Sequence, residues 1–259
     1  MLRREKTNYV IQSVAHALDV LEQFHGELDE LGVTELSKRL KLHKNNVFRL
    51  LATLESRGYI EQNKATENYR LGIRCLQLGQ TYVQQMGLLR QADAVLQSVA
   101  QQSRENTSLA VMRRGAVVPV KVVESNLPVR ITSNVGEGLP LHSTALGKIF
   151  LAYASEDEAR TLAGGTIEKF TEKTIVDWNS LVGHLKQVAE RGYAVDGGEH
   201  LLDVRGVAAP VRDYTRNVVG ALGVGGPAYR MTVERIDKDL APLVQQAAMD
   251  LSSRLGFQG

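Results

Sequence analysis

The chain has a single cysteine, and it has no long apolar run. The lone thiol, Cys75, excludes an internal disulfide and any zinc site built from several cysteines. A membrane-spanning helix needs about 20 consecutive apolar residues, which no stretch of the chain approaches. The charged start, residues 1–6, is followed by no apolar segment of the kind that a secretion signal carries. We therefore expect a cytoplasmic protein that does not enter membranes, with Cys75 as a buried structural thiol.

Enzyme signatures are also scarce. The glycines of residues 220–226 have the wrong spacing for a dinucleotide-binding fingerprint, and Gly147-Lys148 is followed by isoleucine, so the phosphate-loop pattern fails. Side chains that can bind a metal are scattered along the second half of the chain: His142, His184, Asp196, Glu199 and His200. They would form a metal site only if folding brought them together, and hydrogen-bonded or solvated histidines are the simpler interpretation. We expect no catalytic residue, no cofactor and no metal.

Net charge is nearly absent as well, since +2 over 259 residues neither favours nor excludes a nucleic-acid partner. The distribution of charge is more informative. Residues 38–74 hold nine basic and three acidic side chains, namely Lys38, Arg39, Lys41, Lys44, Arg49, Arg57, Lys64, Arg70 and Arg74 against Glu55, Glu61 and Glu67. A segment with such a local excess of positive charge is suited to DNA phosphates.

The same segment has the pattern of a helix-turn-helix. Residues 32–42 predict a short amphipathic helix whose first amides Thr34 can cap. A second helix starts near His43 and Lys44 and repeats apolar residues at helical spacing: Val47, Leu50, Leu51 and Leu54. Residues 59–62 and 68–71 then predict a hairpin wing around the polar tip 63–67. This combination is typical of a winged helix-turn-helix.

The exposed front of the second helix carries side chains that read bases or grip phosphates. Asparagine can pair with an adenine edge, and arginine can contact guanine or a phosphate. The candidate DNA-binding residues are Thr34, His43, Lys44, Asn45, Asn46, Phe48 and Arg49, with Lys64 and Arg70 adding positive charge on the wing. An ordinary helical hairpin with solvated lysines is the alternative, which the wing and the placement of charge disfavour.

The rest of the chain is long enough for a second domain. A connecting helix follows the wing at 73–87, and another helix spans 88–103. Strands are predicted at 108–111, 117–123, 129–133, near 193, at 204–211 and at 218–224; helices are predicted at 144–153, 156–162, 178–191 and 232–255. An α+β domain, with an antiparallel sheet flanked by helices, accommodates this order.

Several stretches together resemble the IclR family of bacterial transcriptional regulators. They are Val33-Thr34-Glu35-Leu36, residues 48–54, Tyr69-Arg70-Leu71-Gly72, residues 138–148, residues 191–196 and residues 207–211. The resemblance implies a winged helix-turn-helix at 8–72, a linker helix at 73–87 and a GAF-like domain at 88–259 that binds a small metabolite. It also implies dimers, and dimers of dimers, on double-stranded operator DNA.

The chain departs from the family in both parts. Where the family often has proline, lysine, serine and threonine, this chain has residues 43–46, so the operator sequence does not carry over. In the effector domain, the positions that often carry cysteines or serines are Ser143, Gly206, Gly223 and Gly225. The resemblance suggests that they line the cavity, so three missing side chains would widen it and make it less polar. We expect an aromatic or medium-sized organic acid rather than a two- or three-carbon acid.

The residues themselves give a separate reason to expect an acid. Ser143 or Thr144 can cap a helix that begins at Ala145, which leaves free amides and the positive helix end at the loop 136–142. A plain cap beside a surface loop is the alternative. Asp196 aligns with a family pocket residue and can accept a hydroxyl, amide or ammonium group, or it can simply stabilise the turn before Gly197-Gly198. The candidate effector-binding residues are Leu139, Ser143, Ala145, Leu146, Asp196, Gly206, Gly223 and Gly225.

The sequence therefore predicts a ligand-responsive transcriptional repressor or activator that is not an enzyme. Two alternatives remain. An enzyme that uses its helix-turn-helix only for docking would need a converging catalytic group of residues, and none is visible. An architectural DNA-binding dimer would need a second domain without a cavity.

Overall fold

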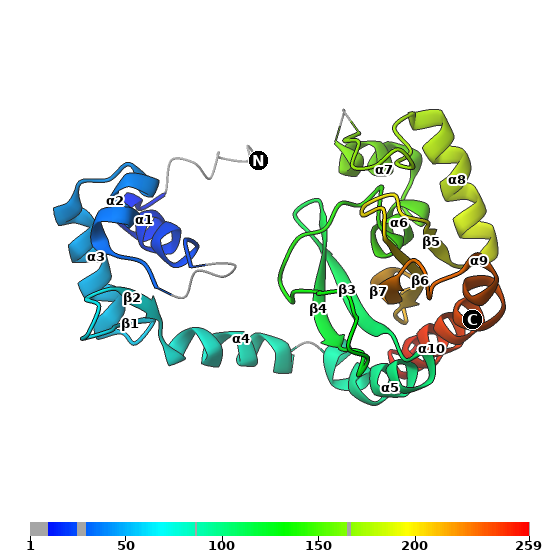
Figure 1. Ribbon diagram of the computed structural model, residues 1–259, viewed down its shortest axis with the longest axis horizontal. Helices are drawn as coiled ribbons and strands as arrows, with labels where there is room; N and C mark the ends of the chain where they lie inside the picture. The colour runs from blue at the N-terminus through cyan, green and yellow to red at the C-terminus, as the bar shows by residue number, and fades with distance from the viewer. Residues whose placement is uncertain (1–9, 25–29, 86, 165–166, 259) are drawn as a thin grey trace, which may run out of the picture. The chain divides into compact units, whose positions relative to one another are not determined.

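The computed structural model describes residues 10–24, 30–85, 87–164 and 167–258. The chain divides into two compact units, Met1–Gln85 and Met86–Gly259, which we describe separately (Figure 1). The predicted first residues of the DNA-binding domain, 8 and 9, lie outside the described residues. No described helix is long and apolar enough to cross a membrane.

The N-terminal unit is a three-helix core with a two-stranded wing. Its elements are α1 (Gln12–Leu21), α2 (Val33–Leu40), α3 (Lys44–Ser56), β1 (Ile60–Gln62), β2 (Tyr69–Leu71) and α4 (Ile73–Gln85). The apolar spacing of the second predicted helix is confirmed, because Val47, Leu51 and Leu54 are buried and Leu50 packs against them. The wing strands pair antiparallel with Glu61 opposite Arg70. The winged helix-turn-helix predicted from the sequence is therefore present.

The predicted cap at Thr34 is wrong. Helix α2 begins at Val33, its N-cap is Gly32, and no side chain caps it. The reason lies in the preceding residue, since Leu31 exchanges two backbone hydrogen bonds with Tyr69 of the wing and the helix must start directly after it. A side chain at the cap would be crowded, because a Cβ on Gly32 would lie 2.8 Å from the Asn68 Oδ1 atom. Thr34 is instead an exposed residue of the first turn.

The C-terminal unit is a five-stranded antiparallel sheet in the order β4-β3-β7-β6-β5. Its strands are β3 (Asn106–Arg113), β4 (Ala116–Val123), β5 (Ala194–Asp196), β6 (Val204–Arg212) and β7 (Val218–Pro227). Helices α5 (Gly87–Ser103) and α10 (Ala241–Arg254) cover one face, and α6 (Ala145–Ala152) and α8 (Trp178–Arg191) cover the other (Figure 1). The short helix α7 (Glu156–Ala163) packs beside α6.

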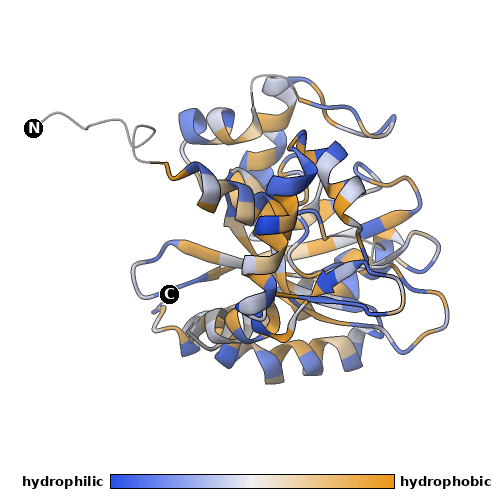
Figure 2. Cartoon of the chain, turned by 90° about the vertical axis from the view of Figure 1, so that its left-hand side faces the viewer, coloured by the Kyte–Doolittle hydropathy of each residue, from blue (hydrophilic) through white to orange (hydrophobic). Residues whose placement is uncertain are grey.

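Alternation along the strands builds two cores, one on each face of the sheet. Val207 and Ala209 face the core that includes α5 and α10, whereas Ala208 faces the core that includes α6 and α8. The helices are amphipathic, and hydrophilic and hydrophobic residues alternate along them in Figure 2. The predicted α+β class, with helices flanking an antiparallel sheet, is therefore present.

Two predicted elements of this unit differ from the structure. Residues 129–133 form a loop rather than a strand, and they pair with no strand of the sheet. The loop is held by the Asn106 side chain, whose Nδ2 donates to the Ile131 carbonyl at 2.8 Å. The predicted last helix is interrupted as α9 (Val233–Arg235), a π-helical segment (Ile236–Leu240) and α10. Pro242 in the first turn of α10 has no amide proton to donate, which disrupts the α-helical pattern there.

Candidate DNA interface and ligand cavity

Helix α3 presents a polar face to solvent. Its first-turn residues Lys44, Asn45 and Asn46 are exposed, as are Arg49 and Phe48, whose side chain is 54% exposed. The opposite face is the buried apolar stripe described above. An aromatic side chain left outside a small domain core is suited to contact with a base or a thymine methyl group.

The turn before α3 leaves its first amides uncapped. His43 occupies the N-cap with an extended backbone, but its side chain makes no capping hydrogen bond. The turn is fixed by Ser37, whose Oγ donates to the Leu42 carbonyl at 2.6 Å, and by Lys41 in the left-handed conformation with φ of 54°. The free amides and the positive end of the helix can accept a DNA phosphate.

The wing is anchored at its tip. Glu30 accepts hydrogen bonds from the Asn63 Nδ2 at 2.6 Å and from the Thr66 Oγ1 at 2.7 Å, and these bonds lower the pKa of Glu30. Lys64 is exposed at the tip. The Arg70 Nε lies 2.6 Å from the Glu61 Oε1 across the hairpin, so this guanidinium is paired within the wing while its side chain remains exposed.

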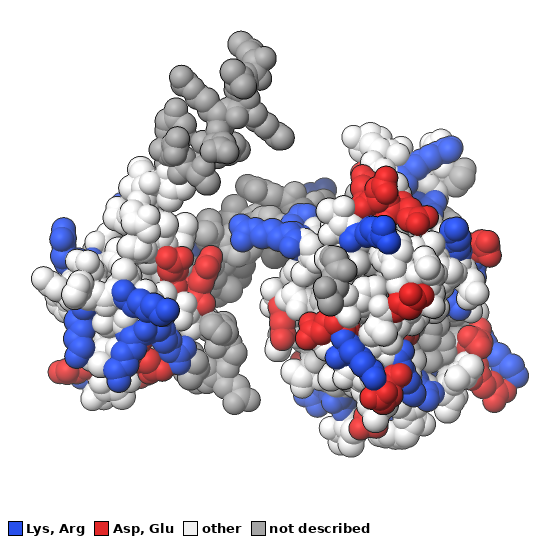
Figure 3. Space-filling view, turned by 90° about the horizontal axis from the view of Figure 1, so that it is seen from above, with Lys and Arg blue, Asp and Glu red and all other residues white. Residues whose placement is uncertain are grey.

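Positive charge gathers on this unit. Lys and Arg side chains cluster on the face of it that Figure 3 shows. From α2 to the wing, the exposed cations that make no ion pair with a described residue are Lys38, Lys41, Lys44, Arg49, Arg57 and Lys64. Their positions match the surface that a winged helix-turn-helix turns toward DNA.

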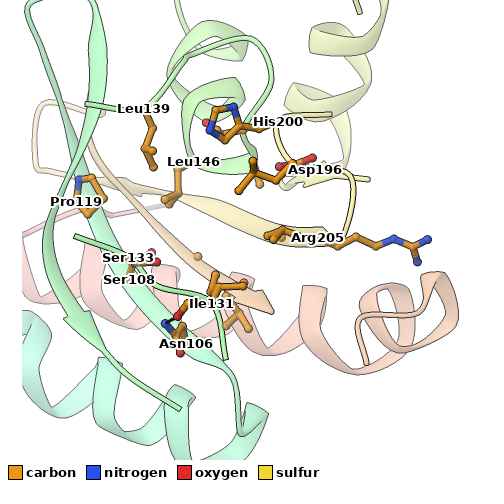
Figure 4. Close-up of a pocket in the computed structure, with 18 of the residues that line it drawn as sticks. Asn106, Ser108, Pro119, Ile131, Ser133, Leu139, Leu146, Asp196, His200 and Arg205 are labelled. Atoms are coloured by element: carbon orange, nitrogen blue, oxygen red, sulfur yellow. Dashed lines mark hydrogen bonds between the residues drawn. The ribbon is translucent and has the colours of Figure 1, made fainter. Parts of the chain in front are cut away.

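The C-terminal unit contains a cavity of about 250 Å³ on the α6 face of its sheet (Figure 4). The start of α6 forms one wall with Thr144, Ala145 and Leu146. The strands β6 and β7 form the floor, and the loop 131–139 forms the opposite wall. The end of β5 and the segment after it close one end of the cavity with Asp196, His200 and Leu201.

All but one of the predicted effector-binding residues line this cavity. The lining residues among them are Leu139, Ala145, Leu146, Asp196, Gly206, Gly223 and Gly225. Ser143 does not line it, because that residue is completely buried and its hydroxyl has no hydrogen-bond partner among the described residues. Thr144 takes the capping role instead: its Oγ1 accepts from the Gly147 amide at 3.1 Å and donates to the Pro140 carbonyl at 2.7 Å.

The glycines of the floor do not simply widen the cavity. A Cβ on Gly223 would lie 3.0 Å from the Leu146 Cδ2, and a Cβ on Gly225 would lie 3.0 Å from the Ile131 Cδ1. Two aliphatic side chains therefore lie where larger residues would otherwise project. The extra width that we expected from these glycines is therefore occupied in part by Leu146 and Ile131.

Asp196 lies at the cavity and also makes the turn hydrogen bonds that the sequence predicted. It lines the cavity, and its Oδ1 accepts the amides of Gly198 at 2.9 Å and Glu199 at 2.7 Å, which is the predicted turn chemistry. The side chain is 6% exposed. Burial raises the pKa of this carboxyl to about 6, against the lowering effect of the two amides.

Several lining residues were not predicted. Asn106 and Ser108 reach the cavity from alternate positions of β3, and Ile131 and Ser133 reach it from the loop that was expected to be a strand. Figure 4 shows Asn106, Ser108 and Ile131 at one end of the cavity and Asp196 and His200 at the other. These residues become neighbours only through the order of strands in the sheet. The alternation of polar residues in β3 was the sole local pattern in the sequence that could have indicated Asn106 and Ser108 as lining residues.

A buried lysine lies behind the cavity wall. The Lys148 side chain on α6 is completely buried, and its Nζ donates to the Glu199 Oε1 and the Val195 carbonyl, both at 2.6 Å. His184 on α8 lies 3.3 Å from the same Nζ. Burial lowers the pKa of Lys148, and Glu199 opposes that shift. The sequence identified this lysine only as a helix residue.

His142 and Cys75 are hydrogen-bonded, whereas His200 packs edge-on against Phe170 and its Nδ1 has no hydrogen-bond partner among the described residues. His142 contacts the Glu168 carbonyl through Nε2 at 2.9 Å and stacks on Phe170. The described residues include no group of three His, Cys, Asp or Glu side chains that could hold a metal ion. Cys75 is half-buried, and its thiol donates to the Tyr59 carbonyl at 3.2 Å.

Comparison with known families shows which protein family the chain belongs to. The family description "Bacterial transcriptional regulator IclR C-terminal" matches residues 80–253, and "IclR helix-turn-helix domain" matches residues 13–64. The chain belongs to the IclR family. It is therefore a DNA-binding transcriptional regulator with a helix-turn-helix domain and a C-terminal effector domain, and not an enzyme.

Individual relatives cover nearly the whole chain. It is 32% identical to the HTH-type transcriptional regulator KdgR of Escherichia coli K12 over 248 residues, 95% of this chain and 94% of that protein. It is 33% identical to the regulator XynR of the same strain over 252 residues, 96% of this chain and 98% of that protein.

Solved structures of the family share the fold. An IclR transcriptional regulator from Alicyclobacillus acidocaldarius superposes with a TM-score of 0.85 at 27% identity, covering 96% of this chain and 100% of that one. An IclR homologue from Microbacterium hydrocarbonoxydans, solved in complex with 4-hydroxybenzoate, superposes with a TM-score of 0.82 at 23% identity, covering 94% of this chain and 99% of that one.

Proposed function

We propose that this IclR-family protein acts in the cytoplasm as a homodimer whose operator affinity changes when a small organic acid binds in the C-terminal cavity. The observation that carries the proposal is the cavity between the α6 start and the glycine floor, whose lining combines apolar side chains with polar and charged ones. An architectural DNA-binding protein with an inert second domain would not need such a cavity.

The size and lining of the cavity favour a ligand with one ring or a medium-length chain. Its volume of about 250 Å³ lies just below the roughly 300–1,000 Å³ of sites for drug-sized ligands. Leu139, Leu146 and Ile131 offer apolar contacts for such a body. The homologue solved with 4-hydroxybenzoate indicates that a protein of this fold can bind a ring-sized acid.

The start of α6 is the proposed place for the carboxylate. The first helical hydrogen bond runs from the Lys148 amide to the Thr144 carbonyl, and the Gly147 amide is capped by Thr144. The amides of Ala145 and Leu146, at the positive end of the helix, are then left for a ligand oxygen. Asp196 and His200 would contact the other polar groups of the ligand.

The proposed DNA contacts come from the exposed face of α3 and from the wing tip. Lys44, Asn45, Asn46 and Arg49 would read bases or grip phosphates, with Phe48 against the groove wall. Lys64 would contact a phosphate from the wing. Two copies on adjacent half-sites would lie about one helical turn, or about 34 Å, apart.

An exposed apolar stripe supports the proposed dimer. Ile11, Val14 and Leu18 lie at helical spacing along and just before α1 and are 54–66% exposed, and they cover no described part of the N-terminal unit's core. A second copy of the chain is the occupant that we propose for this stripe, because palindromic operator sites call for a two-fold pair of reading helices. Pairing of such dimers into tetramers is the further assembly that family membership suggests.

Ligand and DNA binding are coupled in this proposal by a free energy of about 1–3 kcal/mol, which is typical of allosteric proteins. The test is a mobility-shift titration with the DNA upstream of the protein's own gene, at fixed salt, with and without a panel of carboxylic acids. The proposal is supported if the protein binds this DNA in the presence of competitor DNA and one acid changes the affinity. It is contradicted if competitor DNA removes the binding and the affinity responds to salt but to none of the acids.

Calorimetric titration tests the ligand class. Benzoate-like acids should bind more tightly than glyoxylate or pyruvate, because the apolar walls contact a ring and leave a two-carbon acid without neighbours. Tight binding of pyruvate without binding of benzoate would contradict the proposed ligand.

A further inference from the structure

The buried carboxyl of Asp196 lies next to the proposed position of the ligand carboxylate. Asp196 pairs with Gly206 across β5 and β6. A Cβ on Gly206 would lie only 3.8 Å from the Ala145 Cβ, at the start of α6. Because Gly206 has no side chain, nothing at that position separates the Asp196 side chain from the first turn of α6. An acid held at that turn would therefore place its carboxylate beside Asp196.

Only one oxygen of this carboxyl is engaged. The amides of Gly198 and Glu199 both donate to Oδ1, and Oδ2 has no hydrogen-bond partner among the described residues. The side chain is more than nine-tenths buried and lines the cavity. Burial already raises its pKa to about 6 in the absence of a ligand. A second negative charge in the same cavity favours the protonated form further.

Among the described residues, no free cation faces the pair. Lys148 of α6 is the nearest buried cation, but its ammonium is bound to Glu199 and does not line the cavity. Arg205 of β6 lines the cavity with its stem, whereas its guanidinium extends away in Figure 4 and donates to the Met231 carbonyl at 3.0 Å. Other titratable groups lie on the surrounding elements. They include Glu137 of the opposite loop, Lys173 of the segment before α8, His184 and Arg191 of α8, and Glu199 and His200 of the segment after β5.

We propose that the acid enters the cavity together with one proton, which Asp196 holds on Oδ2 and donates to the ligand carboxylate. This inference rests on the proposed function, because it requires an acid ligand. The proton comes from solvent, no covalent bond of the ligand changes, and the resulting O–H···O⁻ hydrogen bond replaces a repulsive pair of carboxylates. Protonated Asp196 thereby allows the cavity to hold an acid despite the carboxyl that already lines it.

Proton uptake makes the affinity depend on pH in a defined direction. Above the free pKa of about 6, Asp196 is ionised and must be protonated on binding, so affinity falls about tenfold for each pH unit. Below that pH the carboxyl is already protonated and the affinity is flat. The Asp196→Asn variant carries an amide that donates the same hydrogen bond without titrating, so the affinity of that variant is independent of pH.

The experiment is isothermal titration calorimetry of the full chain with benzoate, and with hexanoate as an aliphatic acid. Titrations at pH 7.5 in HEPES and in Tris, whose ionisation enthalpies differ, give the number of protons taken up. We expect nearly one proton for the wild-type protein and none for Asp196→Asn. Asp203→Asn is the matched control, because this exposed aspartate lies outside the cavity and should keep the wild-type proton uptake.

Each other outcome overturns the inference in a distinct way. Binding of benzoate or hexanoate without proton uptake shows that Asp196 stays ionised. The proposal that the cavity binds an acid would still hold in that case. Loss of binding in Asp196→Asn shows that the ionised carboxylate accepts a hydrogen bond from the ligand. Absence of binding of either acid to the wild-type protein refutes the proposed acid ligand, and the proton-uptake inference with it.

Discussion

Replacing Lys148 with methionine tests how the wall of the cavity is held. The substitution keeps a long unbranched side chain but removes the ammonium that bridges Glu199 and the Val195 carbonyl. Glu199 is then left as a buried carboxylate, and its Oε2 already has no described partner. Its only other described donor to Oε1 is the Gly197 amide, at 3.4 Å.

The expected cost follows from that geometry. Breaking a buried ion pair by removing one partner typically costs about 3–5 kcal/mol, because the remaining charge stays buried and uncompensated. For a domain of this size, each kcal/mol lowers the Tm by about 2–4 °C. We therefore expect Lys148→Met to lower the Tm of the C-terminal domain by about 6–20 °C.

Differential scanning calorimetry of the full chain measures this shift. In Lys148→Met combined with Glu199→Leu both charges are replaced by apolar groups, so most of the lost stability should return. A single variant that melts within about 2 °C of the wild type would refute the reasoning, and so would a double variant as unstable as the single one.

Three other substitutions test the two sites and the core. Arg49→Ala should weaken operator binding by about 1–3 kcal/mol in a mobility-shift titration and leave benzoate binding unchanged; unchanged affinity with an unchanged salt slope would remove Arg49 from the interface. Gly225→Val should weaken benzoate binding at least tenfold in calorimetry, because its side chain must displace the Ile131 Cδ1 from the cavity edge; equal affinity would place the ligand elsewhere. Burial, with help from Lys148, lowers the pKa of His184 to about 4, so its neutral form stabilises the fold above pH 6.5 and that contribution is lost between pH 6.5 and 4. His184→Gln should therefore reduce the loss of stability between pH 7 and pH 5 in urea titrations, and an identical loss would contradict this role.

The DNA-binding unit shows how far local patterns reach. The spacing of Val47, Leu51 and Leu54 predicted the start of α3 to within one residue, because helical periodicity is a local property of the sequence. The cap at Thr34 failed because the bridge between Leu31 and Tyr69, which are far apart in sequence, decides where α2 begins. The same long-range pairing places Arg70 opposite Glu61 and engages it within the wing.

The effector unit shows the same division more strongly. The resemblance to the family selected positions such as Gly206 and Asp196, and they do meet at one cavity. Neither the resemblance nor any local pattern indicated that the loop 129–133 would be left unpaired, since strand pairing is decided only in the folded sheet. Ile131 and Ser133 line the cavity for that reason. Ser143 is completely buried and does not line the cavity, whereas its neighbour Thr144 both lines it and caps α6.

The sequence by itself determined the elements, the winged helix-turn-helix and the family, because amphipathic periodicity, turn residues and motifs are all contained in short stretches of chain. Tertiary structure alone decided the environment of single side chains. Lys148 is an ordinary helix residue in the sequence, and it becomes a buried ammonium only when β5, α8 and Glu199 surround it. Asp196 acquires its raised pKa in the same way, since desolvation depends on residues far away in the chain that come together only when the sheet closes over the cavity.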